Sequence, residues 1–252
     1  MVKELSVLLS PKNNPARSLR LLNRHKYYTS LFVPVAPPNA PPGYSPPAVP
    51  LNNRDFVSAA WFINHLCTEN WDLWVPFEES LLGLRAAGLR TLSRNSHREL
   101  EMLRRNTQAI GYSIAVVMPW RKYPEKPIDG YKTFAGSVLS RFTKRIVNVE
   151  NCRMIDEMFD EDEKTTKAIE VLLRDGDAEE KRMEMENMYG YFWSAHVLCS
   201  AIFEWCEKTN HISEWWLEER FEESRERWNM VSTTVDLLRW SRKDIIQFSA
   251  AR

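Results

Sequence analysis

The longest apolar stretch of the chain spans residues 189–206 and dominates the hydrophobic pattern. Its only polar members are Ser194, His196, Ser200 and Glu204. A helix that is apolar on every side is a buried helix, and this many polar residues would be unusual in a membrane span. Asp177 and Glu180 have the spacing of a capping box and indicate where the helix begins. We therefore predict a buried central helix over about residues 177–210.

Apolar residues also recur at three- and four-residue steps elsewhere, which is the period of an α-helix. The clearest case follows the capping box Ser96-His-Arg-Glu99 and continues to Pro119. Further helices are expected over about 54–67, 76–92, 133–149, 151–159 and 165–174, and from Ser213, Thr234 and Ser241 onward. The chain shows neither internal repeats nor paired alternating strands. We predict an all-α fold, a multi-helix bundle around the central helix.

The N-terminal region has a different character, because residues 1–50 hold 10 of the 14 prolines. Proline interrupts helices and removes a hydrogen-bond donor from strands, so we predict an extended, polyproline-like arm. Tyr28, Leu31 and Phe32 are apolar residues of this arm. We expect them to dock in an apolar groove, either of the same chain or of a neighbouring copy. These three residues are the predicted partner-binding set of a homo-oligomer.

Changes in composition suggest four segments. The extended arm covers residues 1–52, an N-terminal helical subdomain covers 53–118, and a C-terminal helical subdomain covers 132–252. Between the subdomains, residues 119–131 form a basic, aromatic linker with three prolines, the kind of composition that marks a boundary.

The composition is that of a folded protein without disulfides. The 252 residues are 44% hydrophobic and 12% aromatic, which is ample for a core. Four cysteines, Cys67, Cys152, Cys199 and Cys206, have no framework spacing and indicate reduced core residues in an intracellular compartment, cytoplasmic or nuclear. The first apolar run stops at Ser10-Pro11, which argues against a secretory signal. A mitochondrial presequence is the alternative interpretation of the basic N-terminus.

The net charge of zero is the sum of two opposite halves. Residues 1–145 contain 20 basic and 10 acidic residues, whereas residues 146–252 contain 14 and 24. Such asymmetry indicates a polyanionic or acidic partner for the first half, and it also permits head-to-tail self-association.

Candidate catalytic and metal-binding patterns are weak. The acidic run 156–163 lacks the glycine and the final glutamate of a calcium loop, so we interpret it as a solvated turn. His196 and Cys206 are too far apart on one helix to share a zinc ion. No nucleophile elbow, phosphate loop or dinucleotide motif is present. We predict no catalytic residues, no metal and no cofactor.

The most informative candidate site is a set of basic residues in the middle of the chain. The predicted nucleic-acid-binding residues are Arg94, Arg98, Arg104, Arg105, Arg121, Lys122, Arg141, Lys144 and Arg145. Trp120 and Tyr123 lie among them, and cations interleaved with aromatic rings suit a groove for single-stranded nucleic acid. The alternative is that these cations form salt bridges within the molecule or with an acidic protein.

These features together favour a non-enzymatic, self-assembling nucleic-acid-binding protein of the nucleocapsid or coat type, which contacts the backbone without sequence preference. A helical adaptor or scaffold subunit of a larger complex is the alternative, and an α-helical enzyme with a Trp-lined pocket is a third. We predict no membrane span.

Overall fold

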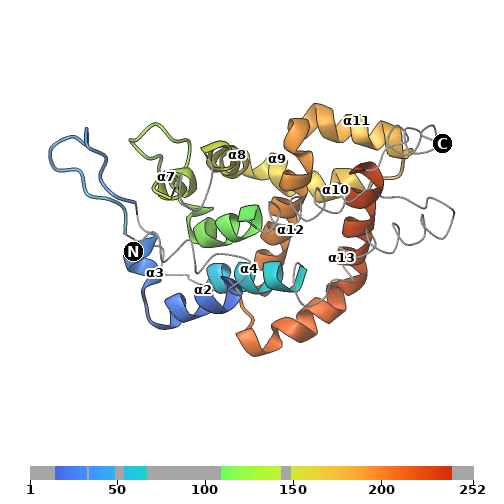
Figure 1. The fold of residues 1–252 in the computed structure, drawn as a ribbon, viewed down its shortest axis with the longest axis horizontal. Coiled ribbons are helices and arrows are strands. Elements are labelled where there is room, and N and C mark those ends of the chain that lie inside the picture. Colours follow the sequence, from blue (N-terminus) through green and yellow to red (C-terminus); the bar gives the residue numbers. More distant parts are fainter. Residues whose placement is uncertain (1–14, 33, 49–53, 67–108, 143–148, 240–252) are drawn as a thin grey trace, which may run out of the picture.

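The computed structural model describes residues 15–32, 34–48, 54–66, 109–142 and 149–239, and every regular element in these ranges is helical (Figure 1). The α-helices are α2 (Pro15–Arg24), α3 (Tyr28–Leu31), α4 (Arg54–Asn64), a helix over 109–117, α7 (Phe134–Ser140), α8 (Val149–Asp160), α9 (Asp162–Thr166), α10 (Ala168–Leu173), α11 (Ala178–Tyr189), α12 (Trp193–Thr209) and α13 (Leu217–Arg239). Short 3-10 turns form η4 (Met118–Trp120), η5 (Gly190–Phe192) and η6 (Glu214–Trp216). The predicted all-α fold is confirmed.

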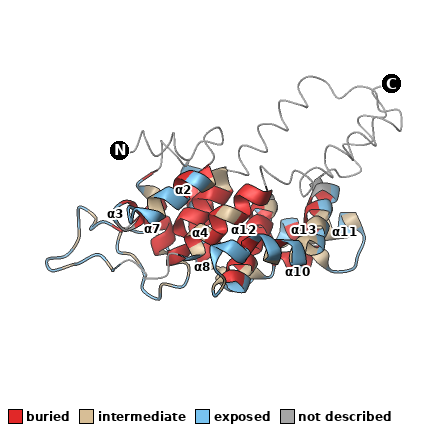
Figure 2. Cartoon of the chain, turned by 90° about the horizontal axis from the view of Figure 1, so that it is seen from below, coloured by how far each residue is buried: buried red, intermediate tan, exposed pale blue. Residues whose placement is uncertain are grey.

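Helix α12 is the buried centre of the molecule (Figure 2). Thirteen of its 17 residues are buried, as its nearly uniform apolar sequence predicts. Helices α4, α9, α10 and α13 pack around it. Among the polar residues of the apolar stretch, Ser200 makes a hydrogen bond inside the molecule. Its hydroxyl donates to the Thr166 carbonyl over 2.8 Å.

Gly190 separates α11 from α12, which the hydrophobic pattern joins in one helix over 177–210. Its backbone angles, φ 69° and ψ −161°, lie in a region that essentially only glycine adopts without strain. The chain then makes the short turn η5 and continues as α12, so that α11 runs in another direction (Figure 1). Most of α11 consequently stays at the surface, and only Met185 and Tyr189 are buried.

Aromatic rings fill the contact between α4, α12 and α13. The indole of Trp205 stacks on Phe62, with ring centroids 5.0 Å apart, and on Trp61 at 5.5 Å. Trp228 of α13 meets Phe62 edge-on. The Trp205 N–H donates to the Ser58 carbonyl over 3.1 Å, which satisfies the polar group of a fully buried indole. This cluster joins residues from both halves of the chain in one core.

The segment that follows α2 is anchored in the same core. The buried rings of Tyr28 and Phe32 contact Phe56 of α4, with centroids 4.7 Å and 6.1 Å apart. The Tyr28 hydroxyl donates to the Val116 carbonyl over 2.9 Å, and the Trp120 N–H donates to the Phe32 carbonyl over 3.0 Å. All three residues of the predicted docking set are therefore buried in the core of their own chain: Tyr28, Leu31 and Phe32.

Residues 34–48 form a loop that projects from the helices (Figures 1 and 2). Two turns, over 37–40 and 41–44, are each closed by a hydrogen bond of 3.0 Å. Gly43 has φ 85° at the third position of the second turn, as a type II turn requires. The arm predicted over 1–52 is therefore not continuously extended in its described part. It also contains α2, where Pro15 occupies the first turn and so does not break the helix.

Other helix boundaries also differ from the prediction. Helix α13 is continuous from Leu217 to Arg239, although Thr234 resembles a helix start. Inside the helix the Thr234 hydroxyl donates to the Met230 carbonyl over 2.9 Å. The residue that resembles a helix cap in the sequence therefore makes a hydrogen bond within the helix. The helix predicted over 133–149 ends at Ser140, and the start predicted at Ser241 lies outside the described residues.

Candidate nucleic-acid interface

Arg121, in the predicted basic linker, is the centre of a polar cluster inside the molecule. Its side chain is only 6% exposed. The guanidinium donates to Asp162 Oδ1 from Nε over 2.8 Å and from Nη2 over 2.7 Å, and it pairs with Glu207 Oε1 at 3.0 Å. Nη2 also reaches the Thr166 hydroxyl at 3.2 Å, and the guanidinium carbon lies 3.6 Å from the centroid of the Phe203 ring. Helices α9 and α12 thus hold this charge, and it is not presented to solvent.

The two lysines of the linker, and Lys132 directly after it, also face acidic side chains of α8 and α12. Ion pairs of 3.3–3.6 Å join Lys122 to Glu207, Lys126 to Asp160 and Lys132 to Glu157. Each lysine is well exposed, so each pair contributes little stability by itself. The lysine charges are nevertheless neutralised by the nearby acids. This arrangement matches the alternative interpretation, in which the cations form salt bridges within the molecule.

The two aromatic residues that we expected to stack on bases are packed against the core. Trp120 is 1% exposed, and its N–H is already bonded to the Phe32 carbonyl. Tyr123 is half-buried, and its ring meets Trp120 and Phe134 edge-on at 5.4 Å and 5.2 Å. The linker is therefore a packed connection and offers no open stacking surface.

Of the remaining members of the predicted basic set, the structure describes only Arg141. Arg141 is exposed at the end of α7, and its guanidinium carbon lies 5.9 Å from the Phe142 ring centroid. Its partial burial lowers the pKa of the guanidinium. The residues outside the described ranges are Arg94, Arg98, Arg104, Arg105, Lys144 and Arg145.

The acidic run over 156–163 has a structural role at its first residue. Asp156 is buried and accepts hydrogen bonds from the backbone N–H groups of Lys132 and Thr133, each at 2.9 Å, and from the Thr133 hydroxyl at 2.7 Å. A Cβ atom on Gly136 would lie 2.2 Å from Asp156 Oδ1, so this carboxylate requires glycine on α7. The run holds the start of α7 and pairs with Lys126 and Lys132.

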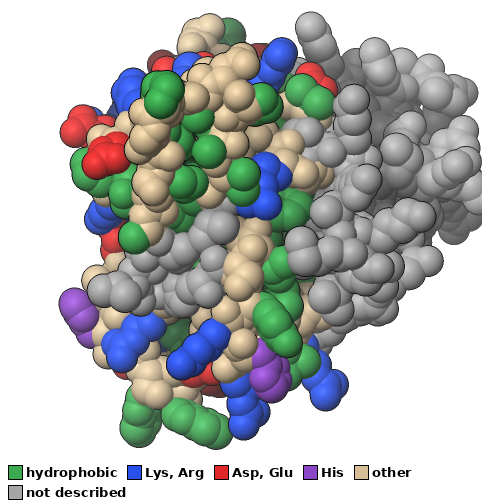
Figure 3. All heavy atoms as spheres, turned by 90° about the vertical axis from the view of Figure 1, so that its left-hand side faces the viewer, with side chains coloured by type: hydrophobic (Ala, Val, Ile, Leu, Met, Phe, Trp, Pro, Cys, Tyr) green, Lys and Arg blue, Asp and Glu red, His purple; other side chains and the backbone are tan. Residues whose placement is uncertain are grey.

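A second basic surface lies on α2. Arg17, Arg20 and Arg24 follow one another at three- and four-residue steps, so they share one face of the helix. All three are exposed, whereas Leu19 on the opposite face is buried. The sequence contains no acidic residue between positions 5 and 54. Figure 3 shows Lys, Arg and His side chains gathered along the lower part of the face that includes α2.

Two adjacent tryptophans, Trp215 and Trp216, project from η6 and are 90% and 60% exposed. An ion pair between Arg20 and Glu214 links η6 to α2. The Trp216 N–H donates to the Ser213 carbonyl over 2.9 Å and closes the turn. This pair was not among the predicted site residues, although two adjacent tryptophans at a turn, outside any apolar periodicity, were the available signal.

Burial shifts the pKa values of three cysteines and of His196 in favour of their neutral forms. Burial raises the thiol pKa of Cys152, to about 11, and that of Cys199 and Cys206, which disfavours the nucleophilic thiolate. Burial, assisted by Lys164, lowers the pKa of His196 to about 4, so its ring is neutral at pH 7. Among the described residues there is no group of three or more His, Cys, Asp or Glu side chains that could hold a metal ion.

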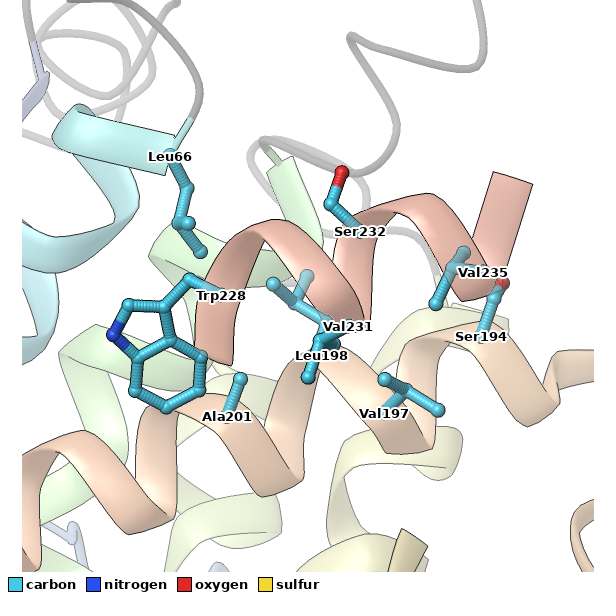
Figure 4. Close-up of a pocket in the computed structure, with 9 residues that line it drawn as sticks. All are labelled: Leu66, Ser194, Val197, Leu198, Ala201, Trp228, Val231, Ser232 and Val235. Carbon is cyan, nitrogen blue, oxygen red and sulfur yellow. The ribbon is translucent and has the colours of Figure 1, made fainter. Parts of the chain in front are cut away.

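A cavity between α12 and α13 is small and mostly apolar (Figure 4). It encloses about 20 Å³ and is lined mainly by valine and leucine side chains with Trp228 at one end. That volume corresponds to about one water molecule. Two hydroxyls, of Ser194 and Ser232, are the polar side chains of its lining. The cavity does not supply the convergent polar groups that a substrate site requires.

No protein-family model matches the sequence, and neither a characterised protein nor a solved structure shows significant similarity to the chain. In the part of the chain that the structure describes, no helix has the length and apolar character needed to cross a membrane.

Proposed function

We propose that the protein is a non-enzymatic nucleic-acid-binding protein that contacts backbone phosphates through the exposed face of α2 and assembles with further copies of itself. The observation that carries this proposal is the exposed row of Arg17, Arg20 and Arg24 on one face of α2, in a stretch with no acidic residue between positions 5 and 54. Arg20 pairs with Glu214 of η6 but its side chain stays 53% exposed, whereas the side chain of Arg121 in the linker is only 6% exposed.

The chemistry of this row suits phosphate. A guanidinium presents several N–H donors in a fixed plane and can bind phosphate oxygens in a bidentate manner. The buried face of α2 fixes the row in position, because Pro15, Ser18 and Leu19 pack into the molecule. Contacts to phosphate carry no sequence information. Binding should therefore show little base preference and should weaken steeply with salt.

Reversing two charges of the row tests this proposal. We expect the double variant Arg17→Glu, Arg24→Glu to lose affinity for oligonucleotides of all sequences alike. Each lost phosphate contact should flatten the logarithmic salt dependence by about 0.7 for a single strand. The matched control is Arg153→Glu, Lys167→Glu, which reverses two exposed cations, one on α8 and one in the turn between α9 and α10, and should leave binding unchanged.

Fluorescence anisotropy at several salt concentrations would measure the affinities, and circular dichroism would confirm that both double variants remain folded. An unmodified protein that shows no salt-dependent binding at low ionic strength would contradict the proposal. Equal losses in the two double variants would also contradict it, because they would indicate a nonspecific effect of net charge.

Self-assembly is proposed to involve the projecting loop 34–48. Residues 27–53 contain no charged side chain, and depletion of charge is typical of the centre of protein interfaces. Loops of this length without regular structure are often functional. The loop is therefore the described segment best suited to contact a second copy.

A helical adaptor in a larger complex is the second candidate function. The observation that favours it is the internal neutralisation of Arg121 and the linker lysines, which removes part of the charge first attributed to nucleic acid. Purification at low salt, followed by the ultraviolet absorbance spectrum, separates the two candidates. Co-purifying nucleic acid supports the first, and its absence together with a stably bound acidic protein supports the second.

A further inference from the structure

The exposure of Trp215 and Trp216 is not explained by the fold. Leu217, the next residue, is 2% exposed and belongs to the core, whereas the two indoles are 90% and 60% exposed. Large apolar side chains in contiguous exposed patches often mark a binding surface. The backbone beneath them is ordered by two hydrogen bonds, from Trp216 N–H to the Ser213 carbonyl and from Leu217 N–H to the Glu214 carbonyl. The turn therefore presents both rings on a fixed support.

The basic face of α2 lies next to this turn. The ion pair between Arg20 and Glu214 connects them directly, and it partly neutralises the nearest acid of η6. Glu218 pairs with the buried His65, at 2.9 Å from Nε2, and its side chain is 61% exposed. Glu219 is a further exposed acid at the start of α13. In Figure 3 hydrophobic side chains lie at the lower edge of the face, below a group of Lys and Arg side chains.

We infer that Trp215 and Trp216 are a base-stacking platform beside the phosphate-binding row of α2, so that the combined surface selects single-stranded over double-stranded nucleic acid. This inference rests on the proposed function. Aromatic side chains bind single strands by stacking on unpaired bases. In a duplex the bases are paired and stacked on each other, so they are not accessible to such a platform. Because every base has an aromatic face, such a platform adds affinity without adding a sequence code.

The geometry favours nucleic acid over a lipid surface. A helix that binds a membrane interface inserts its apolar face into the lipid. The apolar face of α2 is instead buried against α4, and of its leucines only Leu21, at 44%, is among the exposed large hydrophobic residues. The outward-facing side chains of α2 are mainly arginines. Their guanidinium groups suit the successive phosphates of a nucleic-acid backbone.

The test compares Trp215→Ala, Trp216→Ala with the unmodified protein on a single-stranded oligonucleotide and on a duplex of the same length. We expect the affinity for the single strand to fall by at least about tenfold, as the loss of stacking by one base predicts. The affinity for the duplex and the slope of the salt dependence should not change, since no phosphate contact is removed. Trp215→Phe, Trp216→Phe should retain most of the affinity. Met230→Ala, which removes a side chain that is 52% exposed on α13, is the matched control.

The outcomes separate the two proposals. If the unmodified protein binds neither oligonucleotide, both proposals fail. If it binds in a salt-dependent manner but the alanine double variant binds the single strand equally well, only the stacking platform is overturned. If the double variant loses binding to vesicles that contain phosphatidylserine while oligonucleotide binding persists, the tryptophans belong to a lipid surface and this inference is wrong.

Discussion

A single guanidinium, that of Arg121, joins the predicted linker to two helices, and its removal tests the cluster at the scale of one residue. Arg121→Met should leave the carboxylates of Asp162 and Glu207 without their common cation. Because the guanidinium is buried but both acids remain partly exposed, we expect a loss of about 2–4 kcal/mol in the free energy of unfolding. Urea denaturation measures it. Lys122→Met, at a position 71% exposed, is the control and should change stability by less than about 0.5 kcal/mol.

His196 provides a second residue-scale prediction, on pH. Its pKa is about 4 in the folded protein, against the model-peptide value of 6.5. The unfolded chain therefore takes up a proton on this residue before the folded protein does, and stability is lost as pH falls from 7 toward 4. Between pH 7 and pH 5 the loss should be roughly 2 kcal/mol. Denaturation at both pH values should show a smaller loss in His196→Gln. Equal losses would indicate that His196 is protonated in the fold.

At the scale of elements, Gly190 decides that α11 and α12 are two helices. Its angles, φ 69° and ψ −161°, strain any side chain, so Gly190→Ala should destabilise the fold by about 1–3 kcal/mol. Thermal unfolding measures the effect. Asn187→Ala, at an exposed position of α11, is the control and should be neutral or slightly stabilising, because alanine has the higher helix propensity. An unchanged stability in Gly190→Ala would mean that the chain can pass through this point as a continuous helix.

At the scale of the whole molecule, the N-terminal region divides into an anchor and a loop. The rings of Phe32 and Phe56 are 6.1 Å apart, so the loop 34–48 is flanked in the sequence by two residues that contact each other in the core. Replacing residues 36–47 by a short Gly-Ser linker should leave the melting temperature unchanged and should lower the molecular mass measured by light scattering. Deleting residues 1–32 should instead remove the Tyr28 and Phe32 anchors, a loss of several kcal/mol. An unchanged mass in the first variant would show that the loop is not the assembly contact.

The amino-acid sequence by itself determined the class of the fold and the identity of its centre. A period near 3.6 residues and an absence of alternating strands predict helices, and the nearly uniform apolar character of 193–206 requires burial wherever the helix lies. The shared face of Arg17, Arg20 and Arg24 was not predicted, because the prolines of residues 1–50 favoured an extended arm and the helix α2 became evident only in the structure.

Only the tertiary structure decided which charges and aromatic rings remain available. Arg121 is neutralised by Asp162 and Glu207, and such distant partners have no local signature. Trp120 and Trp215 both stand beside charged residues in short 3-10 turns, yet one is 1% and the other 90% exposed. The difference arises because α7 and the N-terminal anchor pack over Trp120, whereas the described helices leave Trp215 uncovered. The burial of a residue depends on the elements that pack over it, and the adjacent residues in the sequence do not determine those contacts.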